Sequence, residues 1–251
     1  MSKSNDAPIW ARPEPGARRP RHTREQIAAV ALEIADREGI EAVSMRRVAM
    51  ELGAGTMTLY HYVRNKDELI DLMDDAIMGQ VLVPEGELPS NWREALAELA
   101  KRSRDALVRH PWALEGLRGA RGGPNGMRHF EQTLAAVAAL DIELADKLEL
   151  VCAVDDYVFG YVLRADLEAT QAPGDDEFDE LVLPFYEAQL ETGDYPNISK
   201  LFAGLDAASG FDLVVGVFRA EGRFERGLER LLDGLEASLP RSVIRDAAEP
   251  G

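Results

Sequence analysis

The 251-residue sequence contains a single cysteine, Cys152, so it cannot form an intrachain disulfide. A chain without disulfides suits a reducing compartment, and we interpret Cys152 as a small apolar core residue rather than as a redox sensor. No run approaches the roughly 18 consecutive apolar residues of a membrane-spanning helix. The N-terminus also lacks the apolar core and cleavage site of a secretion signal. These absences predict a cytoplasmic protein without membrane contact.

Motifs of catalysis and metal binding are missing as well. The sequence has no phosphate-binding Gly-x-x-x-x-Gly-Lys-Ser/Thr loop, no His-Glu-x-x-His, no Cys-x-x-Cys and no Gly-x-Ser-x-Gly elbow. Its four histidines lack the spacing of metal ligands. We therefore expect no catalytic residues, no metal site, no cofactor and no enzyme activity.

Charge is distributed unevenly along the chain. The net charge is −17, but residues 1–66 carry 11 Lys and Arg against 8 Asp and Glu. Residues 67–251 carry 17 basic against 37 acidic residues. Basic charge confined to one end is what a local phosphate-binding surface requires, and the acidic remainder would repel nucleic acid. The composition, 46% hydrophobic and 29% charged, is typical of a globular protein that buries a core.

Residues 44–66 have the pattern of two short helices around a glycine turn. Ser44 can cap the first helix, and Gly53 lies where a helix ends in a left-handed residue. Thr56 is a plausible cap for a second helix near 56–62. Two short helices with a tight turn, the second with an exposed polar and aromatic face, are typical of a DNA-reading helix-turn-helix.

The segments on either side extend this pattern. A capping box at residues 23–26 opens a helix that Gly39 closes, and Asn65 starts a helix that follows the motif almost without a linker. Tilting that last helix would therefore move the motif. Residues 1–20 hold four prolines and scattered polar residues, which predicts a disordered arm. Arg18, Arg19, Arg21 and Arg24 either let this arm contact phosphate or the minor groove, or the arm is a solvated tail without a role.

The motif resembles that of one protein family. The runs Arg46-Arg47-Val48-Ala49, Leu52-Gly53, Thr58-Leu59-Tyr60-His61-Tyr62-Val63 and Asn65-Lys66-Asp67-Glu68-Leu69 are similar to the signature of the TetR family of bacterial repressors. The residues around Phe224 and 227–235 resemble the subgroup nearest the tetracycline repressor. The resemblance implies an all-α fold, in which a three-helix DNA-binding head precedes a larger helical domain for ligand binding and dimerisation.

The resemblance implies DNA contacts for nine residues: Arg46, Arg47, Thr56, Met57, Thr58, Tyr60, His61, Tyr62 and Lys66. Arg46 is expected to reach base edges, for which Arg suits guanine O6 and N7, or else to be a phosphate clamp or plain surface. Arg47 contacts phosphate or remains at the surface. The first three recognition-helix residues meet base edges, whereas the two tyrosines and the lysine contact phosphate. Two alternatives to DNA contact stay open: Tyr60 packs in the core, and His61 and Lys66 are simply exposed to solvent.

The resemblance also implies a small-molecule effector in the helical body. Candidate lining residues, for which ordinary core packing stays open, are Met73, Trp112, Leu117, His129, Phe130, Asp156, Tyr157, Phe159 and Arg164. Leu117 and Leu82 align with tetracycline-contacting histidines, one of which binds magnesium. The departure makes a magnesium–tetracycline complex doubtful, and we expect a more lipophilic or aromatic effector.

The part after residues 84–89 is rich in Ala and Leu and shows no strand-like alternation, which predicts further helices. We expect them near 91–109, 111–118, 125–140, 143–169, 176–191 and 211–237, with a short one near 197–204. The two longest, 143–169 and 211–237, are expected to pack in the core and, by the resemblance, to pair across a two-fold axis in a homodimer.

The predicted organisation has four parts: a disordered arm over 1–20, a helix-turn-helix DNA-binding domain over 21–66, an effector-binding and dimerisation domain over 67–240, and a tail over 241–251. The predicted function is transcriptional regulation, most simply repression relieved when an effector releases the protein from a palindromic operator. Two alternatives stay open. One is a ligand- or partner-binding protein of the same fold without operator-specific repression, and the more distant one is a helical enzyme.

Overall fold

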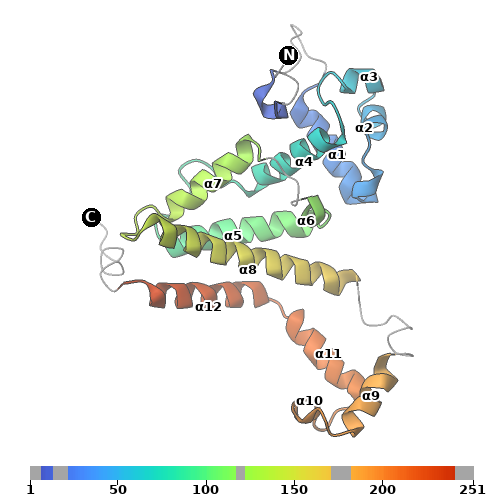
Figure 1. Ribbon diagram of the computed structural model, residues 1–251, viewed down its shortest axis with the longest axis vertical. Helices are drawn as coiled ribbons and strands as arrows, with labels where there is room; N and C mark the ends of the chain where they lie inside the picture. The colour runs from blue at the N-terminus through green and yellow to red at the C-terminus, as the bar shows by residue number, and fades with distance from the viewer. Residues whose placement is uncertain (1–6, 14–21, 117–121, 171–181, 241–251) are drawn as a thin grey trace. The chain divides into compact units, whose positions relative to one another are not determined.

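The computed structural model describes residues 7–13, 22–116, 122–170 and 182–240, and every regular element in these ranges is a helix (Figure 1). The all-α prediction is confirmed for them. None of these helices is both long and apolar enough to cross a membrane. The chain divides into two compact units, one formed by residues 1–162 with 235–251 and the other by residues 163–234.

The first helix of the head, α1 (Arg24–Glu38), begins at the predicted capping box. The Gln26 N–H donates to the Thr23 hydroxyl at 3.2 Å, and the Thr23 N–H donates to the Gln26 side chain at 3.1 Å. A short 3-10 helix, η3 (Ile40–Ala42), leads to the motif. The buried face of α1 packs against α4, so this helix forms the back of the head.

The two short helices of the motif are α2 (Met45–Glu51) and α3 (Thr56–Leu59). The Ser44 hydroxyl caps α2 as predicted, and Gly53 has a left-handed φ of 63°, which a side chain would strain. The predicted cap of α3 is wrong. Gly55 occupies the cap position without a side-chain hydrogen bond, and Thr56 is the first residue inside the helix.

The recognition segment is also less helical than expected. α3 ends at Leu59, although the N–H groups of Tyr62 and Val63 still donate to the Leu59 carbonyl at 2.9 and 3.0 Å. Residues 56–62 therefore form one helical turn followed by tight turns. So short a helix depends on packing rather than on its own hydrogen bonds for stability.

The head is joined to the body by α4 (Lys66–Val81). The Asn65 side chain caps this helix by accepting a hydrogen bond from the Glu68 N–H at 2.8 Å, as the sequence predicts. α4 packs against α1 on one side and against α5 and α7 on another. The same rigid element therefore contacts both the head and the body.

The body of the first unit contains α5 (Trp92–Arg109), α6 (Ala113–Gly116), α7 (Pro124–Val137) and most of α8 (Leu144–Thr170). These helices occupy the regions where the sequence predicts them. α6 is the described part of the helix expected near 111–118. α7 packs on α4 and α5, so the three helices form one packed group.

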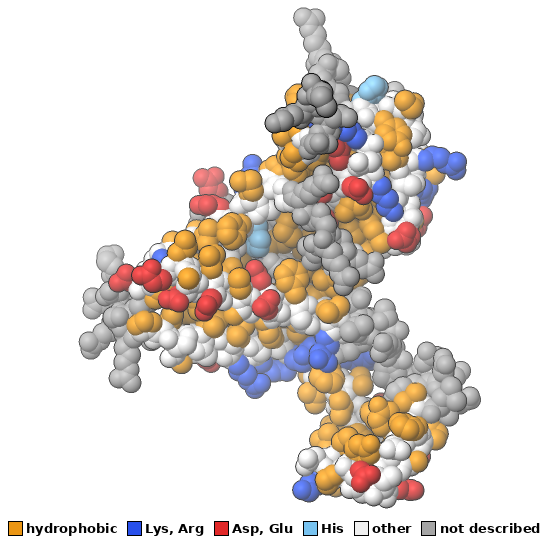
Figure 2. Space-filling model, in the orientation of Figure 1, with side chains coloured by type: hydrophobic (Ala, Val, Ile, Leu, Met, Phe, Trp, Pro, Cys, Tyr) orange, Lys and Arg blue, Asp and Glu red, His pale blue; other side chains and the backbone are white. Residues whose placement is uncertain are grey.

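The second unit contains α9 (Leu183–Glu191), α10 (Pro196–Leu201) and α11 (Ala207–Phe218). The Phe211 ring lies 4.7 Å from that of Tyr186 and 5.4 Å from that of Phe202, measured between ring centres. Other apolar side chains of these helices are exposed, and Figure 2 shows hydrophobic groups over much of the face of this part.

The single helix expected over 211–237 is wrong. The region forms α11 and a separate helix, α12 (Arg223–Ser238). Gly222 between them has a φ of 68°, a conformation incompatible with a continuous right-handed helix. The apolar residues keep a helical spacing across Gly222, so the sequence pattern does not reveal that the helix is interrupted there.

Residues 7–13 differ from the disordered arm that their composition predicts. They include the 3-10 helix η2 (Ile9–Ala11), in which the Ile9 side chain is fully buried. The Arg24 guanidinium donates to the carbonyls of Ile9 and Arg12 at 2.9 Å each, and Arg12 forms an ion pair with Glu68 on α4 at 2.5 Å. Arg24 is thus buried against this segment, which corrects its expected contact with DNA. The rest of the expected arm, with Arg18 and Arg19, and the neighbouring Arg21 lie outside the described residues.

Candidate nucleic-acid interface and ligand cavity

The outer face of α3 is exposed because a single residue anchors the helix. The Leu59 side chain is 2% exposed, whereas Met57 is 74% and Tyr60 44% exposed. Thr58 and His61 are exposed as well. A short helix that buries one leucine and leaves polar and apolar groups outward can place those groups against base edges.

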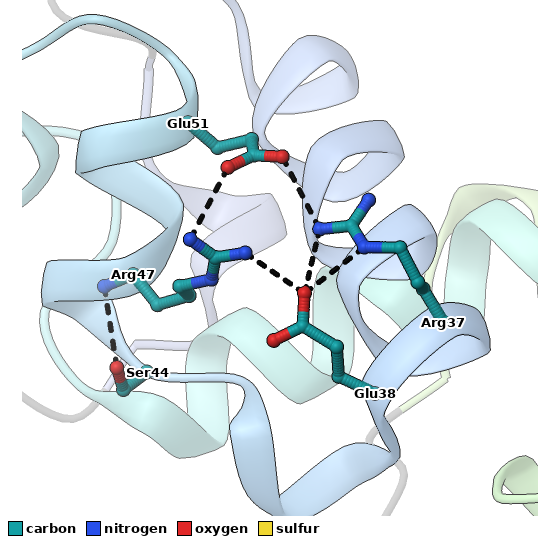
Figure 3. A network of polar contacts seen from close by, with 5 residues as sticks. All are labelled: Arg37, Glu38, Ser44, Arg47 and Glu51. Carbon is teal, nitrogen blue, oxygen red and sulfur yellow. Dashed lines mark hydrogen bonds and ion pairs between the residues drawn. The ribbon is translucent and has the colours of Figure 1, made fainter.

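Arg46 and Arg47, adjacent in sequence, differ in their surroundings. Arg46 is exposed, and its side chain forms no hydrogen bond or ion pair within the described residues. Arg47 is half-buried, and its guanidinium lies 2.8 Å from a Glu38 carboxylate oxygen and 3.5 Å from one of Glu51 (Figure 3). Arg46 is therefore available to a ligand, whereas Arg47 is already paired.

The pairing of Arg47 belongs to a closed network of four charged side chains. Arg37 donates to Glu38 at 2.9 Å and to Glu51 at 3.2 Å, so that each of α1 and α2 supplies one arginine and one glutamate to the network (Figure 3). The hydrogen bond from Arg37, followed by that from Arg47, lowers the pKa of Glu38. The network ties α2 to the end of α1.

Three of the nine predicted DNA-contacting residues are buried, half-buried or already paired. Tyr62 is 7% exposed and belongs to the core of the head, which corrects its expected place on the outer face. Thr56 is half-buried, and Arg47 is paired with carboxylates. The other six are exposed on one stretch of chain: Arg46, Met57, Thr58, Tyr60, His61 and Lys66.

The predicted effector-contacting residues differ in burial. Met73 is fully buried, and the Trp112 indole N–H donates to Asp36 at 2.8 Å. Phe130 and Phe159 are 53% and 41% exposed, and Asp156 is exposed. Leu117 lies outside the described residues.

The remaining three have partners or surroundings of their own. The Tyr157 ring lies 6.4 Å from that of Tyr161, and the Arg164 guanidinium lies 5.0 Å from the centre of the Phe218 ring. Burial lowers the pKa of His129. None of the eight described candidates lines either of the two cavities below, and their contact with an effector stays a prediction.

The first cavity, which we term the α4 cavity, has a volume of about 240 Å³. It lies in the group formed by α4, α5, α6 and the start of α7. Its lining residues are Asp71, Asp74, Asp75, Ile77, Met78, Leu107, Ala113, Gly122, Gly123 and Gly126. Three carboxylates thus line an otherwise apolar space.

Asp75 is held by the N-terminus of α7. Its carboxylate accepts hydrogen bonds from the N–H groups of Asn125 at 2.8 Å and Gly126 at 3.1 Å. Burial raises the pKa of Asp75, while these two donors lower it. The approach requires glycine at position 123, because a Cβ there would lie 2.3 Å from the Asp75 carboxylate carbon.

Asp74 has no such donors. Its side chain is 7% exposed, and neither carboxylate oxygen has a hydrogen-bond partner. Burial, together with the nearby charge of Asp71, raises the pKa of Asp74 to about 7. A buried carboxylate without partners is costly, so this residue calls for a functional explanation.

A second, wider cavity of about 640 Å³ lies beside η2, α1, α4 and α7. Near it, a buried polar cluster joins the head to the body. Asp36 on α1 accepts from Trp112 and lies 2.7 Å from Nδ1 of His110, whose Nε2 lies 3.1 Å from the Gln80 side chain on α4. His110 is 3% exposed.

Sequence reasoning missed both the α4 carboxylates and the Asp36 cluster. The spacing of Asp71, Asp74 and Asp75 places them on one side of a helix, which is a weak signal for a common site. Nothing in the sequence distinguishes that side from a solvated one. Within the described residues, no group of three or more His, Cys, Asp and Glu side chains could hold a metal ion.

Two family models match the sequence. The model described as bacterial regulatory proteins, tetR family, matches residues 27–73, and the model described as tetracyclin repressor-like, C-terminal domain, matches residues 85–239. The first match contains the helix-turn-helix, and the second covers α5 to α12.

Relatives of known name agree with these matches. The HTH-type transcriptional repressor DrrR1 of Streptomyces coeruleorubidus is 35% identical, over 90% of this chain and 81% of its own. An HTH-type transcriptional regulator of Saccharopolyspora erythraea is 34% identical, over 94% of this chain and 95% of its own.

A solved structure shows the same fold. The TetR family protein ActR of Streptomyces coelicolor, in complex with (S)-DNPA, is 28% identical, with a TM-score of 0.65 over 88% of this chain and all of that one. The helix-turn-helix geometry and the extent of these matches lead to one conclusion. The chain belongs to the TetR family of bacterial DNA-binding transcriptional regulators and carries a tetracycline-repressor-like C-terminal domain.

Proposed function

We propose that this regulator is a repressor that binds a palindromic operator as a homodimer and leaves it when a small molecule binds in the helical body. The observation that carries the proposal is the exposed face of α3, anchored by buried Leu59 and preceded by an unpaired Arg46. In this reading, residues 21–66 read DNA, and residues 67–240 bind the effector and dimerise. The protein acts in the cytoplasm and catalyses no reaction.

The six exposed residues divide into two roles on DNA. Met57 and Thr58 at the start of α3 meet base edges, where a methyl group can pack on thymine and a hydroxyl can serve several bases. Arg46 reaches a guanine edge from α2. Tyr60 and Lys66 contact phosphate, and His61 contacts phosphate or a base edge. We assign Arg47 to holding α2 in place, because its guanidinium is already bound by Glu38 and Glu51.

The link between effector and DNA is α4. This helix starts directly after the recognition segment, with Asn65 as its N-cap. Five of its residues line the α4 cavity. A ligand in that cavity therefore touches the element that carries α3. The Asp36 cluster provides a second connection between α1 and the body. An effector that favours the non-binding arrangement needs a coupling of about 1–3 kcal/mol to act as a switch.

The relatives support an effector response. DrrR1 is named a repressor, and ActR has been solved with (S)-DNPA and with actinorhodin. Because neither of the aligned histidines of the tetracycline repressor is present here, we propose a different, lipophilic effector.

We assign dimerisation to α8, which in the family pairs with its counterpart across a two-fold axis. Phe159 and Leu163 lie one helical turn apart on α8 and are 41% and 52% exposed. Apolar side chains at this spacing form a stripe suited to a helix from a second copy.

Selection of bound DNA from a random-sequence pool, at physiological salt, tests the proposal. A palindrome with half-sites about one helical turn apart, roughly 10 base pairs, is the expected result. Arg46→Ala should then weaken binding and relax discrimination at one base position, whereas Arg128→Ala, a change of an exposed arginine on α7, should leave both unchanged. Recovery of no sequence above background would refute operator-specific repression.

A further inference from the structure

The unpaired carboxylate of Asp74 is buried at the wall of the α4 cavity. The side chain is more than nine-tenths buried, neither oxygen has a partner among protein atoms, and the residue lines the α4 cavity. Asp75, which also lines the cavity, is already engaged by two N–H groups of α7. The cavity therefore offers one carboxylate whose hydrogen-bonding capacity is wholly unused.

The remaining walls of the cavity are apolar. They include Ile77 and Met78 from α4, Leu107 from α5 and Ala113 from α6. An apolar cavity of about 150 Å³ holds a benzene molecule. The 240 Å³ of the α4 cavity thus accommodates an aromatic ring with a short chain.

The chemistry of this cavity excludes an anion and disfavours a metal ion. A negative group would face the aspartate carboxylates that line the cavity. Mg²⁺ demands near-octahedral oxygen ligands and Ca²⁺ takes six to eight. No group of His, Cys, Asp and Glu in the described ranges is suited to a metal, and the other walls are hydrocarbon. An organic cation with one charged end and one apolar end matches both the carboxylate and the walls.

We propose that the α4 cavity is the effector site and that it selects a small lipophilic ammonium ion, whose nitrogen pairs with Asp74 while its apolar part packs on Ile77, Met78 and Leu107. The inference rests on the proposed effector response. Its binding step is independent of DNA and can be tested alone. The cation would supply the hydrogen-bond donors that the protein does not.

Binding of an ammonium ion that stays protonated from pH 6 to pH 8 should still depend on pH. The cation requires ionised Asp74, and the pKa of this carboxyl is about 7 in the folded protein. The other charged groups nearby are Asp71 and Asp75 on the same helix and Arg128 on α7, while α5 and α6 add no titratable lining residue. Affinity should therefore rise by about tenfold from pH 6 to pH 8, since the ionised fraction of Asp74 rises about that much.

Isothermal titration of the full-length protein with 2-phenylethylammonium and with 2-phenylethanol tests this. The two probes differ mainly in the charged group. At pH 8 the cation should bind tenfold or more tightly than the alcohol, and Asp74→Asn should reduce this preference to less than about threefold. Asp67→Asn, which changes an exposed carboxylate on the same helix, should leave it intact. Circular dichroism verifies that each variant is folded.

Several outcomes would overturn the proposal: equal binding of the two probes, binding of neither, a preference that survives Asp74→Asn, or saturable binding of MgCl₂ that Asp74→Asn abolishes. Adding the cation to the protein bound to its selected operator then separates site from function. Cation binding without DNA release upholds the site and refutes its role as the effector site. Release by a neutral lipophile alone upholds effector-responsive repression and refutes the cation.

Discussion

Replacing Asp74 by asparagine should stabilise the folded protein, and increasingly so as pH rises. The substitution keeps the size of the side chain and removes its charge. Burial and the charge of Asp71 raise the pKa of Asp74 to about 7. The unfolded chain loses this proton near pH 4, whereas the folded protein keeps it until about pH 7. Over that window the wild type loses stability with rising pH, and a neutral side chain does not.

The magnitude follows from the shift. Each tenfold change in an acid dissociation constant corresponds to about 1.4 kcal/mol, so a pKa moved from about 4 to about 7 makes ionisation roughly 4 kcal/mol more costly in the folded state. About a third of this loss of stability is already present at pH 5. Water that enters the cavity lowers the cost of ionisation and so reduces the remaining loss. We therefore expect the advantage of Asp74→Asn to grow by about 2 kcal/mol between pH 5 and pH 8.

Urea unfolding at pH 5, 6, 7 and 8 measures this difference, with equal protein concentrations because a dimer's stability depends on them. Other titrating groups cancel, since both proteins contain them. Asp67→Asn is the matched control. Its carboxylate is exposed in the first turn of α4, where negative charge favours the helix, so asparagine should gain no advantage with pH. A gap for Asp74→Asn that stays constant with pH, or a more stable wild type, would show that Asp74 is ionised and satisfied.

Three further predictions concern other parts of the molecule. Gly123→Ala should destabilise by about 1–3 kcal/mol in urea unfolding, because its Cβ would displace the Asp75 carboxylate from the start of α7; unchanged stability would mean that α7 shifts freely. Arg47→Ala should cost roughly 1 kcal/mol or less of stability and leave the salt dependence of operator binding unchanged; a slope smaller by about one would make Arg47 a phosphate contact. Phe159→Asp should raise the dimer dissociation constant at least tenfold in sedimentation, whereas Phe130→Asp, at a similarly exposed aromatic on α7, should not. Equal effects would place the interface elsewhere.

Local chemistry accounts for what the sequence determined. The capping box at Thr23, the caps at Ser44 and Asn65 and the left-handed Gly53 each depend on residues within four positions of one another. Helix positions and the helix-turn-helix motif follow from the same short-range patterns, and so did the family. One local error, Thr56 as a cap, arose because Gly55 beside it can also take the extended cap conformation.

The exposure of individual side chains was decided by tertiary packing. Tyr60 and Tyr62 are chemically alike, but α3 ends at Leu59, and the turns that follow direct Tyr62 into the core and leave Tyr60 outside. Arg46 and Arg47 are likewise adjacent, and only the second meets Glu38 at the end of α1.

The α4 carboxylates make the same point over a longer distance. Three aspartates along a helix are ordinarily a solvated face, and the sequence contains no sign that α7 will cover them. The donors to Asp75 are about 50 positions further along the chain, and the cavity at Asp74 exists only where α4, α5, α6 and the start of α7 meet. Short-range patterns fix where helices begin and end. Which charges become buried, and hence which ligand the protein can recognise, depends on contacts between residues far apart in sequence.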